Sequence, residues 1–183
     1  MNETTSLKIR IFGDPILRKR AAKVEKVTDC QRELLDEMAK LMYAGSGIGL
    51  AAPQAGINAS MIVVDIASRL YKLINPKIVK RQGRQVLEEG CLSIPGICIN
   101  VKRAKKITVK AQNENGEPLA IEAEDLLACV FQHEIDHLKG KLIVDYASFF
   151  EKLKIRKKIE ELKKSSKNER LYQTETKYCK LQL

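Results

Sequence analysis

The chain has 183 residues, with 33 Lys or Arg against 23 Asp or Glu and a formal net charge of +10 at pH 7. This length fits one domain with enough chain to bury a core, and a composition of 44% hydrophobic and 31% charged residues is typical neither of a disordered tail nor of a membrane protein. No apolar run approaches the roughly 18–20 residues that a membrane-spanning helix needs, so no membrane partner is expected.

The export and redox signals favour the cytoplasm. The first twenty residues carry Glu3 and Asp14 and lack an apolar stretch followed by a small-residue cleavage site, which argues against a secretory signal. The five cysteines are an odd number and contain no C-x-x-C pair. This usage favours reduced thiols in a cytoplasmic protein over a disulfide framework.

The predicted elements begin with a helix over residues 28–44, where apolar side chains recur on one face. Thr28 is its candidate N-cap, because a hydroxyl there can accept from a backbone N–H that lacks a partner within the helix. Residues 45–56, GSGIGLAAPQAG, contain too much Gly and a Pro to continue the helix, and they predict a shaped loop. Residues 61–66 are rich in β-branched side chains and predict a buried strand.

A hairpin and two helices are predicted next. Apolar side chains alternate along 105–112 and again after Asn115-Gly116, a pair that suits the positive φ angles of a tight turn. Residues 122–139 start with acidic side chains and precede Gly140, which predicts a helix with favourable ends. A second helix is predicted over about 148–165. We therefore expect an α+β fold, with antiparallel strands and a hairpin around a central helix and with a C-terminal helix.

The basic charge is concentrated near the C-terminus. Residues 151–183 hold eleven Lys or Arg against five Asp or Glu, whereas residues 1–150 hold 22 against 18. Such a segment suggests contact with polyanions, of which nucleic acid is the commonest. The alternative is a solvated helix that only keeps the protein soluble.

The two histidines of the chain fall as His133-Glu-Ile-Asp-His137. A spacing of four residues on a helix sets both imidazoles on one face, about 6 Å apart along the axis, where each can reach one ion. Glu134 lies beside them and can address a water on that ion without ligating it. The alternative is a helix with two surface histidines, but the H-E-x-x-H pattern carries its own metal-dependent mechanism.

A catalytic metal site needs a third protein ligand and an open position. Cys129 is an unsuitable partner, because positions eight residues apart on one straight helix lie about 12 Å apart. Cys91 is the better candidate, since a thiol behind a Gly in a short segment can be held rigidly and deprotonated by the ion. Glu160 and Glu161 are the ligands that a zinc protease arrangement would recruit instead.

Three segments, Gly47–Gln54, Glu89–Ser93 and Gln132–His137, together resemble the three signature motifs of the peptide deformylases. The resemblance covers roughly residues 8–160. It implies removal of the formyl group from the N-terminal formylmethionine of newly made polypeptides in a bacterial-type cytoplasm. The implied cofactor is one divalent ion, usually Fe²⁺, with Zn²⁺ or Ni²⁺ able to replace it. We accordingly expect a catalytic domain over 1–165 and a polar basic tail over 166–183.

The resemblance also assigns roles to individual residues. It implies metal ligation by Cys91, His133 and His137. It implies acid and base catalysis by Glu134, and an oxyanion site made of the Gln54 side-chain amide and the Leu92 backbone N–H. The glycines at 47 and 49 let an extended peptide run close to the backbone. The candidate methionine-binding residues around them are Ile48, Gly49, Leu126, Cys129 and Val130.

One departure from the family pattern concerns the peptide beyond methionine. Some members carry an arginine a few residues after Ser-Ile-Pro, where it contacts the peptide backbone, whereas this chain has none until Arg103. Two other functions stay open on the residues alone. One is a zinc endopeptidase that uses Glu160 or Glu161, and the other is a basic RNA-associated module with a structural metal. For a deformylase, the basic C-terminal helix suggests the ribosome as a partner.

Overall fold

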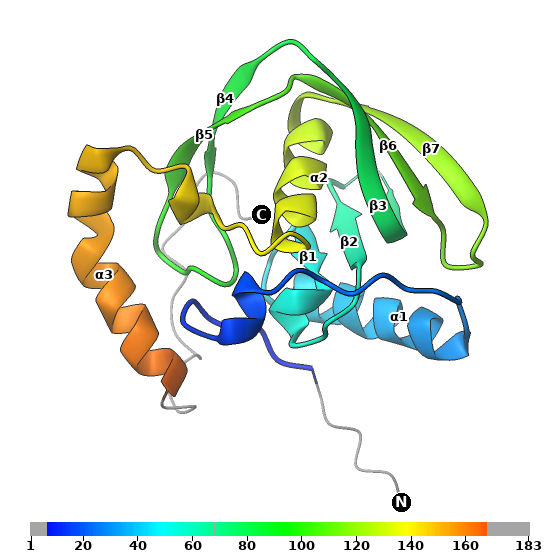
Figure 1. Ribbon diagram of the computed structural model, residues 1–183, viewed down its shortest axis with the longest axis horizontal. Coiled ribbons are helices and arrows are strands. Elements are labelled where there is room, and N and C mark those ends of the chain that lie inside the picture. The colour runs from blue at the N-terminus through cyan, green and yellow to red at the C-terminus, as the bar shows by residue number, and fades with distance from the viewer. Residues whose placement is uncertain (1–6, 68, 168–183) are drawn as a thin grey trace, which may run out of the picture.

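The computed structural model describes residues 7–67 and 69–167 (Figure 1). Within this part of the chain, seven strands form two antiparallel sheets that are accompanied by three α-helices and three short 3₁₀ segments. The strands are β1 (Gly49–Ala51), β2 (Met61–Asp65), β3 (Leu70–Gln82), β4 (Gln85–Glu89), β5 (Ile99–Arg103), β6 (Lys106–Gln112) and β7 (Pro118–Glu124). The helices are α1 (Asp29–Ala44), α2 (Asp125–His137) and α3 (Phe149–Lys167), and the 3₁₀ segments are η1 (Pro15–Arg18), η2 (Ala52–Ala55) and η3 (Ile143–Asp145).

The sheets surround α2. The larger sheet has the order β1-β2-β3-β6-β7, and the smaller one pairs β4 with β5. Figure 1 shows α2 between the long β3, β6 and β7 strands and the β4–β5 pair, with α1 at the lower right and α3 at the left, on the side of the β4–β5 pair. Strand β1 is an edge of the larger sheet, so one side of its backbone has no strand beside it within the described residues.

Three apolar clusters hold these elements together. The first joins α2 to the larger sheet through Phe131, Val130, Val109 and neighbouring side chains. A second cluster packs α1 beneath β1 and β2, and a third joins the segment after Cys91 to one face of α3. The metal helix is therefore the central element of the domain, which confirms the α+β expectation.

The first predicted helix is confirmed, but its cap differs in detail. Helix α1 begins after Thr28, and the Thr28 hydroxyl donates to the Gln31 side chain, which also accepts from the Thr28 N–H. The hydroxyl does not accept from the helix backbone as expected. Residues 45–56 are also more regular than the predicted loop, because they form β1 and η2 before ending at Gly56 with a positive φ of 84°.

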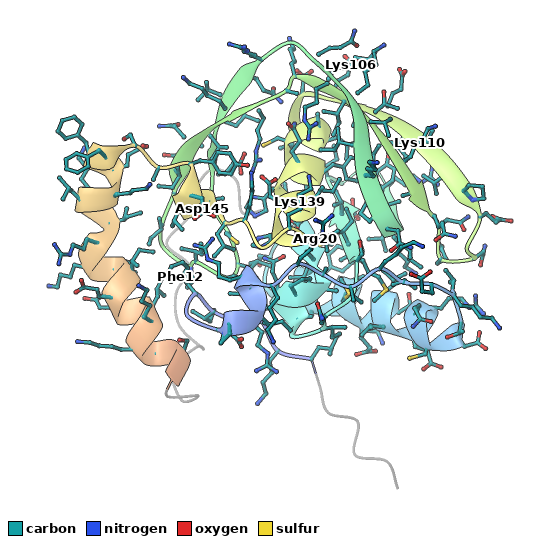
Figure 2. The ribbon with its side chains drawn as sticks, viewed as in Figure 1. Phe12, Arg20, Lys106, Lys110, Lys139 and Asp145 are labelled. Atoms are coloured by element: carbon teal, nitrogen blue, oxygen red, sulfur yellow. The ribbon has the colours of Figure 1, made fainter. Side chains whose placement is uncertain are left out.

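The hairpin of β6 and β7 is confirmed, whereas the predicted start of the metal helix is wrong by three residues. Strand pairing continues to the Lys106–Glu124 pair, so Glu122 and Glu124 belong to β7. Their carboxylates pair with Lys106 (labelled in Figure 2) instead of capping the helix. Cross-strand pairing thus extends the hairpin through residues that the charge pattern assigned to α2. Gly140 follows the helix with a positive φ of 71°, as its position predicts.

Helix α3 continues past the expected boundary at residue 165, and the rest of the proposed tail, residues 168–183, lies outside the described residues. Its first turn is capped reciprocally, because the Ser148 N–H donates to Glu151 and the Glu151 N–H donates to the Ser148 hydroxyl. Near its other end, the Lys163 ammonium lies 5.8 Å from the centre of the ring of Phe12, which is labelled in Figure 2. The helix therefore rests against the N-terminal segment.

Two further expectations can be compared with the structure. Cys30, Cys91 and Cys129 carry free thiols, whereas Cys98 is disulfide-bonded, so reduced thiols hold for three of the cysteines that the structure describes. No helix among the described residues is long and apolar enough to span a bilayer.

Candidate metal centre

Cys91, His133 and His137 come together in the centre of the domain, and all three side chains are buried. The Cys91 sulfur lies 3.3 Å from His137 Nε2, which lies 3.2 Å from His133 Nε2. Ligand atoms about 2.0–2.3 Å from a tetrahedral ion are separated from one another by roughly 3.3–3.8 Å. The three groups therefore fit a single divalent ion, with Cys91 supplied by the segment between the β4–β5 strands and both histidines by α2.

The surroundings of Cys91 set its protonation. Burial raises the pKa of its thiol, and the negative charge of Glu134 raises it further, while hydrogen bonds from the backbone N–H groups of Ser93 and Ile94 lower it. Burial likewise lowers the pKa of His137 well below its usual range, as does the charge of His133. A neutral imidazole is ready to ligate, and a divalent cation deprotonates a coordinating thiol outright. The donor set is thus suited to a cation.

The two histidines differ in their outer contacts. His133 donates through Nδ1 to the carboxylate of Glu89 at 2.9 Å, which leaves its Nε2 directed at the metal site. Burial raises the pKa of Glu89, but hydrogen bonds from Arg103 and His133 outweigh that cost and lower it to about 2. Glu89 is therefore an ionised acceptor. His137 Nδ1, in contrast, is buried with no hydrogen-bond partner among the described residues.

Glu134 lies beside the metal group without ligating it. Its side chain is 0% exposed, and neither carboxylate oxygen has a hydrogen-bond partner among the described residues. Burial raises its pKa well above the usual range, and the charge of Glu89 adds to that effect. A carboxyl group with a raised pKa that keeps both oxygens free is suited to exchanging a proton with a reactant.

Strand β1 passes directly over this carboxyl group. A Cβ atom added to Gly49 would lie 2.3 Å from Glu134 Oε1 and 3.0 Å from Val130 Cγ1. At Gly47, an added Cβ would lie 2.7 Å from Leu92 Cδ1. A side chain at Gly49 or Gly47 would therefore force Glu134 or Leu92 to move. The two glycines bring an open backbone edge beside the metal group, where an extended chain could add as a strand.

Two hydrogen-bond donors border the same space. Gln54 accepts from the Ala51 N–H through Oε1 at 2.7 Å, which turns its Nε2 towards Cys91 Sγ at 3.5 Å. Leu92 follows Cys91 directly, and its backbone N–H donates to no backbone group among the described residues. The side-chain amide of Gln54 thus lies next to the metal group, and Leu92 directly follows one of its ligands in the sequence.

The candidate methionine-binding residues gather in one apolar cluster. Cys129 and Val130 of α2 are buried there, and Ile48 and Leu126 pack against them half-buried. Leu87 of β4 is one of the further partly buried side chains in this cluster, and its membership does not distinguish it from the surrounding core. Its signal was weak, because one Leu in a short alternating strand resembles any other core position.

The alternative ligands and contacts lie elsewhere. Glu160 and Glu161 are exposed on α3, and Glu160 pairs with Arg156, so neither belongs to the metal group. Arg103 is also unavailable as a contact for bound peptide, because its side chain is 4% exposed and is bound by Glu89 and Asp136. No sequence pattern indicated these buried ion pairs. Glu89 and Asp136 lie within or beside the metal motifs, but nothing in their spacing showed that one arginine joins them.

Comparisons with known proteins agree with this geometry. The family model described as Polypeptide deformylase matches residues 6–153. A peptide deformylase of Hamiltonella defensa subsp. Acyrthosiphon pisum (strain 5AT) is 46% identical over 161 residues, which cover 86% of this chain and 94% of that protein. The crystal structure of a peptide deformylase from Legionella pneumophila matches with a TM-score of 0.81 at 41% identity, and it covers 88% of this chain and 98% of its own. A plant peptide deformylase crystal structure matches with a TM-score of 0.85 at 35% identity, covering 93% and 96%.

Proposed function

This chain belongs to the polypeptide deformylase family, and from that premise we propose that it removes the formyl group from the N-terminal formylmethionine of newly made polypeptides and releases formate. The observation that carries the proposal is the buried carboxyl group of Glu134. It stands next to a Cys-His-His group with both oxygens unpartnered among the described residues. A structural metal site has no use for such an acid, whereas a hydrolase requires a group that moves protons.

Cys91, His133 and His137 would hold the ion. When bound, a divalent ion polarises a carbonyl and makes a water molecule acidic enough to lose a proton near neutral pH. We propose Fe²⁺ as the ion in the cell, with Zn²⁺ or Ni²⁺ able to take the same three ligands. The thiolate of Cys91 makes the site sensitive to oxidation. The iron form should therefore lose activity in air faster than the nickel form, and equal half-lives would argue against redox chemistry here.

The remaining groups act on the substrate. Glu134 takes a proton from the attacking water and gives it to the departing amine, which leaves formate and a free N-terminus. Gln54 Nε2 and the Leu92 N–H would stabilise negative charge on the formyl oxygen. Gln54 needs no reorganisation for this, because the hydrogen bond from Ala51 already fixes its amide.

The substrate would lie along β1. The free edge at Gly49 can pair with the backbone of an extended peptide, and the cluster around Cys129 and Val130 receives the methionine side chain. With Arg103 buried in an ion pair, contacts beyond the first residue depend on the peptide backbone more than on a charged clamp. We therefore propose low selectivity for the second side chain of the peptide.

The cytoplasm is the proposed location, because newly made chains emerge there. The exposed lysines of α3 would contact the ribosome by meeting rRNA phosphates, while the half-buried Ile155 and Ile159 hold the helix to the domain. The approach is electrostatic, so it should weaken steeply as salt rises.

Formate release from a formyl-Met peptide, followed with anaerobically purified protein, tests the function directly. Glu134→Ala should keep its metal and lose about 10²–10⁴-fold in turnover, because Glu134 moves protons without ligating the ion. Cys91→Ala should lose the metal, whereas Glu160→Ala should keep both metal and activity. Near-normal turnover by Glu134→Ala would overturn the proposed mechanism, and a metal-free Glu160→Ala would favour the zinc endopeptidase instead.

A further inference from the structure

A hydrogen-bond network of polar side chains extends from the metal ligand His133 to the surface next to α3. Glu89 accepts from His133 Nδ1 and from the Cys129 thiol, which lies 3.1 Å from Glu89 Oε1. Arg103 donates to both Glu89 oxygens, at 2.7 and 2.9 Å. The carboxylate that orients His133 is thus itself held at both oxygens.

Asp136 and Tyr146 complete this hydrogen-bond network. Arg103 Nη1 donates to Asp136 Oδ2, and the same oxygen accepts from the Tyr146 hydroxyl at 2.6 Å. The Tyr146 ring also covers the guanidinium, with 4.9 Å between the Arg103 Cζ atom and the ring centre. At 37% exposed, Tyr146 is the outermost member, and it lies between η3 and the start of α3.

Each hydrogen bond in this network restricts the orientation of the next side chain. The Arg103 guanidinium is planar and donates in fixed directions, so the position of Asp136 determines how squarely Arg103 faces Glu89. The Tyr146 hydroxyl fixes the Asp136 carboxylate, and its ring keeps water off the far face of Arg103. Because Glu89 sets the tautomer and orientation of His133, a disturbance at Tyr146 is transmitted to the metal ligand.

We propose that Tyr146 is a positioning residue for the metal site, acting on His133 through Asp136, Arg103 and Glu89. The proposal rests on the deformylase function proposed above, but it concerns how firmly the ion is held as well as how fast the reaction runs. Of the two histidine ligands, His133 is the one with this support, because His137 Nδ1 has no hydrogen-bond partner among the described residues.

Tyr146→Phe is the informative variant, because it keeps the ring over Arg103 and removes only the hydroxyl. The chain offers a matched control in Tyr43→Phe. The Tyr43 hydroxyl donates to Asp65 at 2.7 Å. This is the same kind of hydrogen bond, but it lies at the end of α1 and outside the network around His133. Both variants lose one tyrosine–aspartate hydrogen bond, and Tyr146→Phe also loses the 3.4 Å hydrogen bond that its hydroxyl accepts from Arg103 Nη1. The control therefore measures the effect of losing a surface tyrosine–aspartate bond away from the metal site.

The measurements are the rate of metal release to a chelator, the visible spectrum of the Co²⁺-substituted protein, and the melting temperature of the metal-free protein. Loss of a direct outer partner of a metal ligand typically costs 10–100-fold in metal affinity, and Tyr146 acts from further out, so we expect release about 3–10-fold faster in Tyr146→Phe. We also expect a shifted Co²⁺ spectrum and a lower kcat at unchanged KM. Tyr43→Phe should match the wild type in all three.

If Tyr146→Phe and Tyr43→Phe release metal at the wild-type rate with wild-type Co²⁺ spectra, and only their melting temperatures fall, Tyr146 is structural. Equal acceleration of release in both variants would also overturn the proposal, because the effect would then follow general stability. Metal release and spectra do not require formate production, so these results stand apart from the test of the proposed function.

Discussion

The last two helices of the described chain are held in different ways. Nine of the thirteen residues of α2 are buried, and two of its polar side chains, His133 and Asp136, are hydrogen-bonded by Glu89 of β4 and Arg103 of β5. On α3, Leu162 is the one buried side chain among the described residues, while Phe149 and Phe150 are more than 70% exposed. Substitutions on α2 and its neighbours should therefore change the chemistry. Substitutions on α3 should change attachment and binding.

The largest expected effect comes from Gly49→Ala beside α2. The new Cβ would lie 2.3 Å from Glu134 Oε1, so Glu134 must move from its position near the metal group. We expect kcat/KM to fall by about 10²–10⁴-fold, the usual contribution of a general base, with the metal retained. Gly45→Ala is the control, because its Cβ would meet only the flexible ends of Ile9 and Leu92, at 3.2 Å. Equal losses in the two variants would contradict a specific contact with Glu134.

The attachment of α3 is tested by Leu162→Ala. Leu162 is buried in the same cluster as Ile94 and Ile99, so its truncation should cost about 2–5 kcal/mol in the free energy of unfolding measured in urea. Leu153→Ala on the same helix removes the same atoms from a side chain that is 53% exposed, and its cost should stay within about 0.5 kcal/mol. Similar values would show that α3 contributes no more to stability on its packed face than on its open one.

Ribosome binding by the basic face of α3 is tested by replacing its lysines. Deleting the helix would be less specific, because it would also expose the apolar cluster around Leu162. The triple variant Lys154→Gln, Lys157→Gln and Lys164→Gln should pellet less with ribosomes and show a salt dependence flatter by about 0.7–0.9 log units per lost phosphate contact. Turnover of a short formylated peptide should be unchanged.

The sheet provides the control for that experiment. Lys77, Lys80 and Lys110 are exposed on β3 and β6, and their change to Gln removes the same charge. If both triple variants pellet equally poorly, net charge alone governs the association. A control that binds like the wild type would assign the contact to α3.

The smallest expected effect lies at high pH. Burial raises the pKa of Tyr146, and its hydrogen bond to Asp136 raises it further, to about 12. Because the folded state holds this proton more tightly than the unfolded chain, the resulting stability is complete below about pH 10 and is lost as pH rises through 12. Between pH 10 and 12, wild-type stability should therefore fall more than that of Tyr146→Phe. Parallel stability curves for the two proteins would contradict a role for Asp136 in holding the hydroxyl.

The sequence alone predicted much of the site. The spacing of His133 and His137, the Glu between them and the Cys91 segment indicated one metal group, and the structure brings these ligands together. Prediction was weaker where two elements compete for the same residues. Acidic side chains at 122–124 suit a helix N-terminus, but pairing with β6 holds them in β7, because an added strand pair binds backbone as well as side chains.

The sequence by itself determined the types of metal ligand, the spacing of the two histidines on α2, and the positions of the glycines that let a backbone approach Glu134. Local pattern reports such features because a helix or strand repeats over a few residues. Only the tertiary structure decided which groups support them. The path from His133 through Glu89, Arg103 and Asp136 to Tyr146 joins α2, β4, β5 and the segment between η3 and α3, and no role for Arg103 was predicted from the sequence. Burial makes an unpaired charge costly, so the fold pairs the charges that it encloses, and no spacing along the chain encodes that choice of partners.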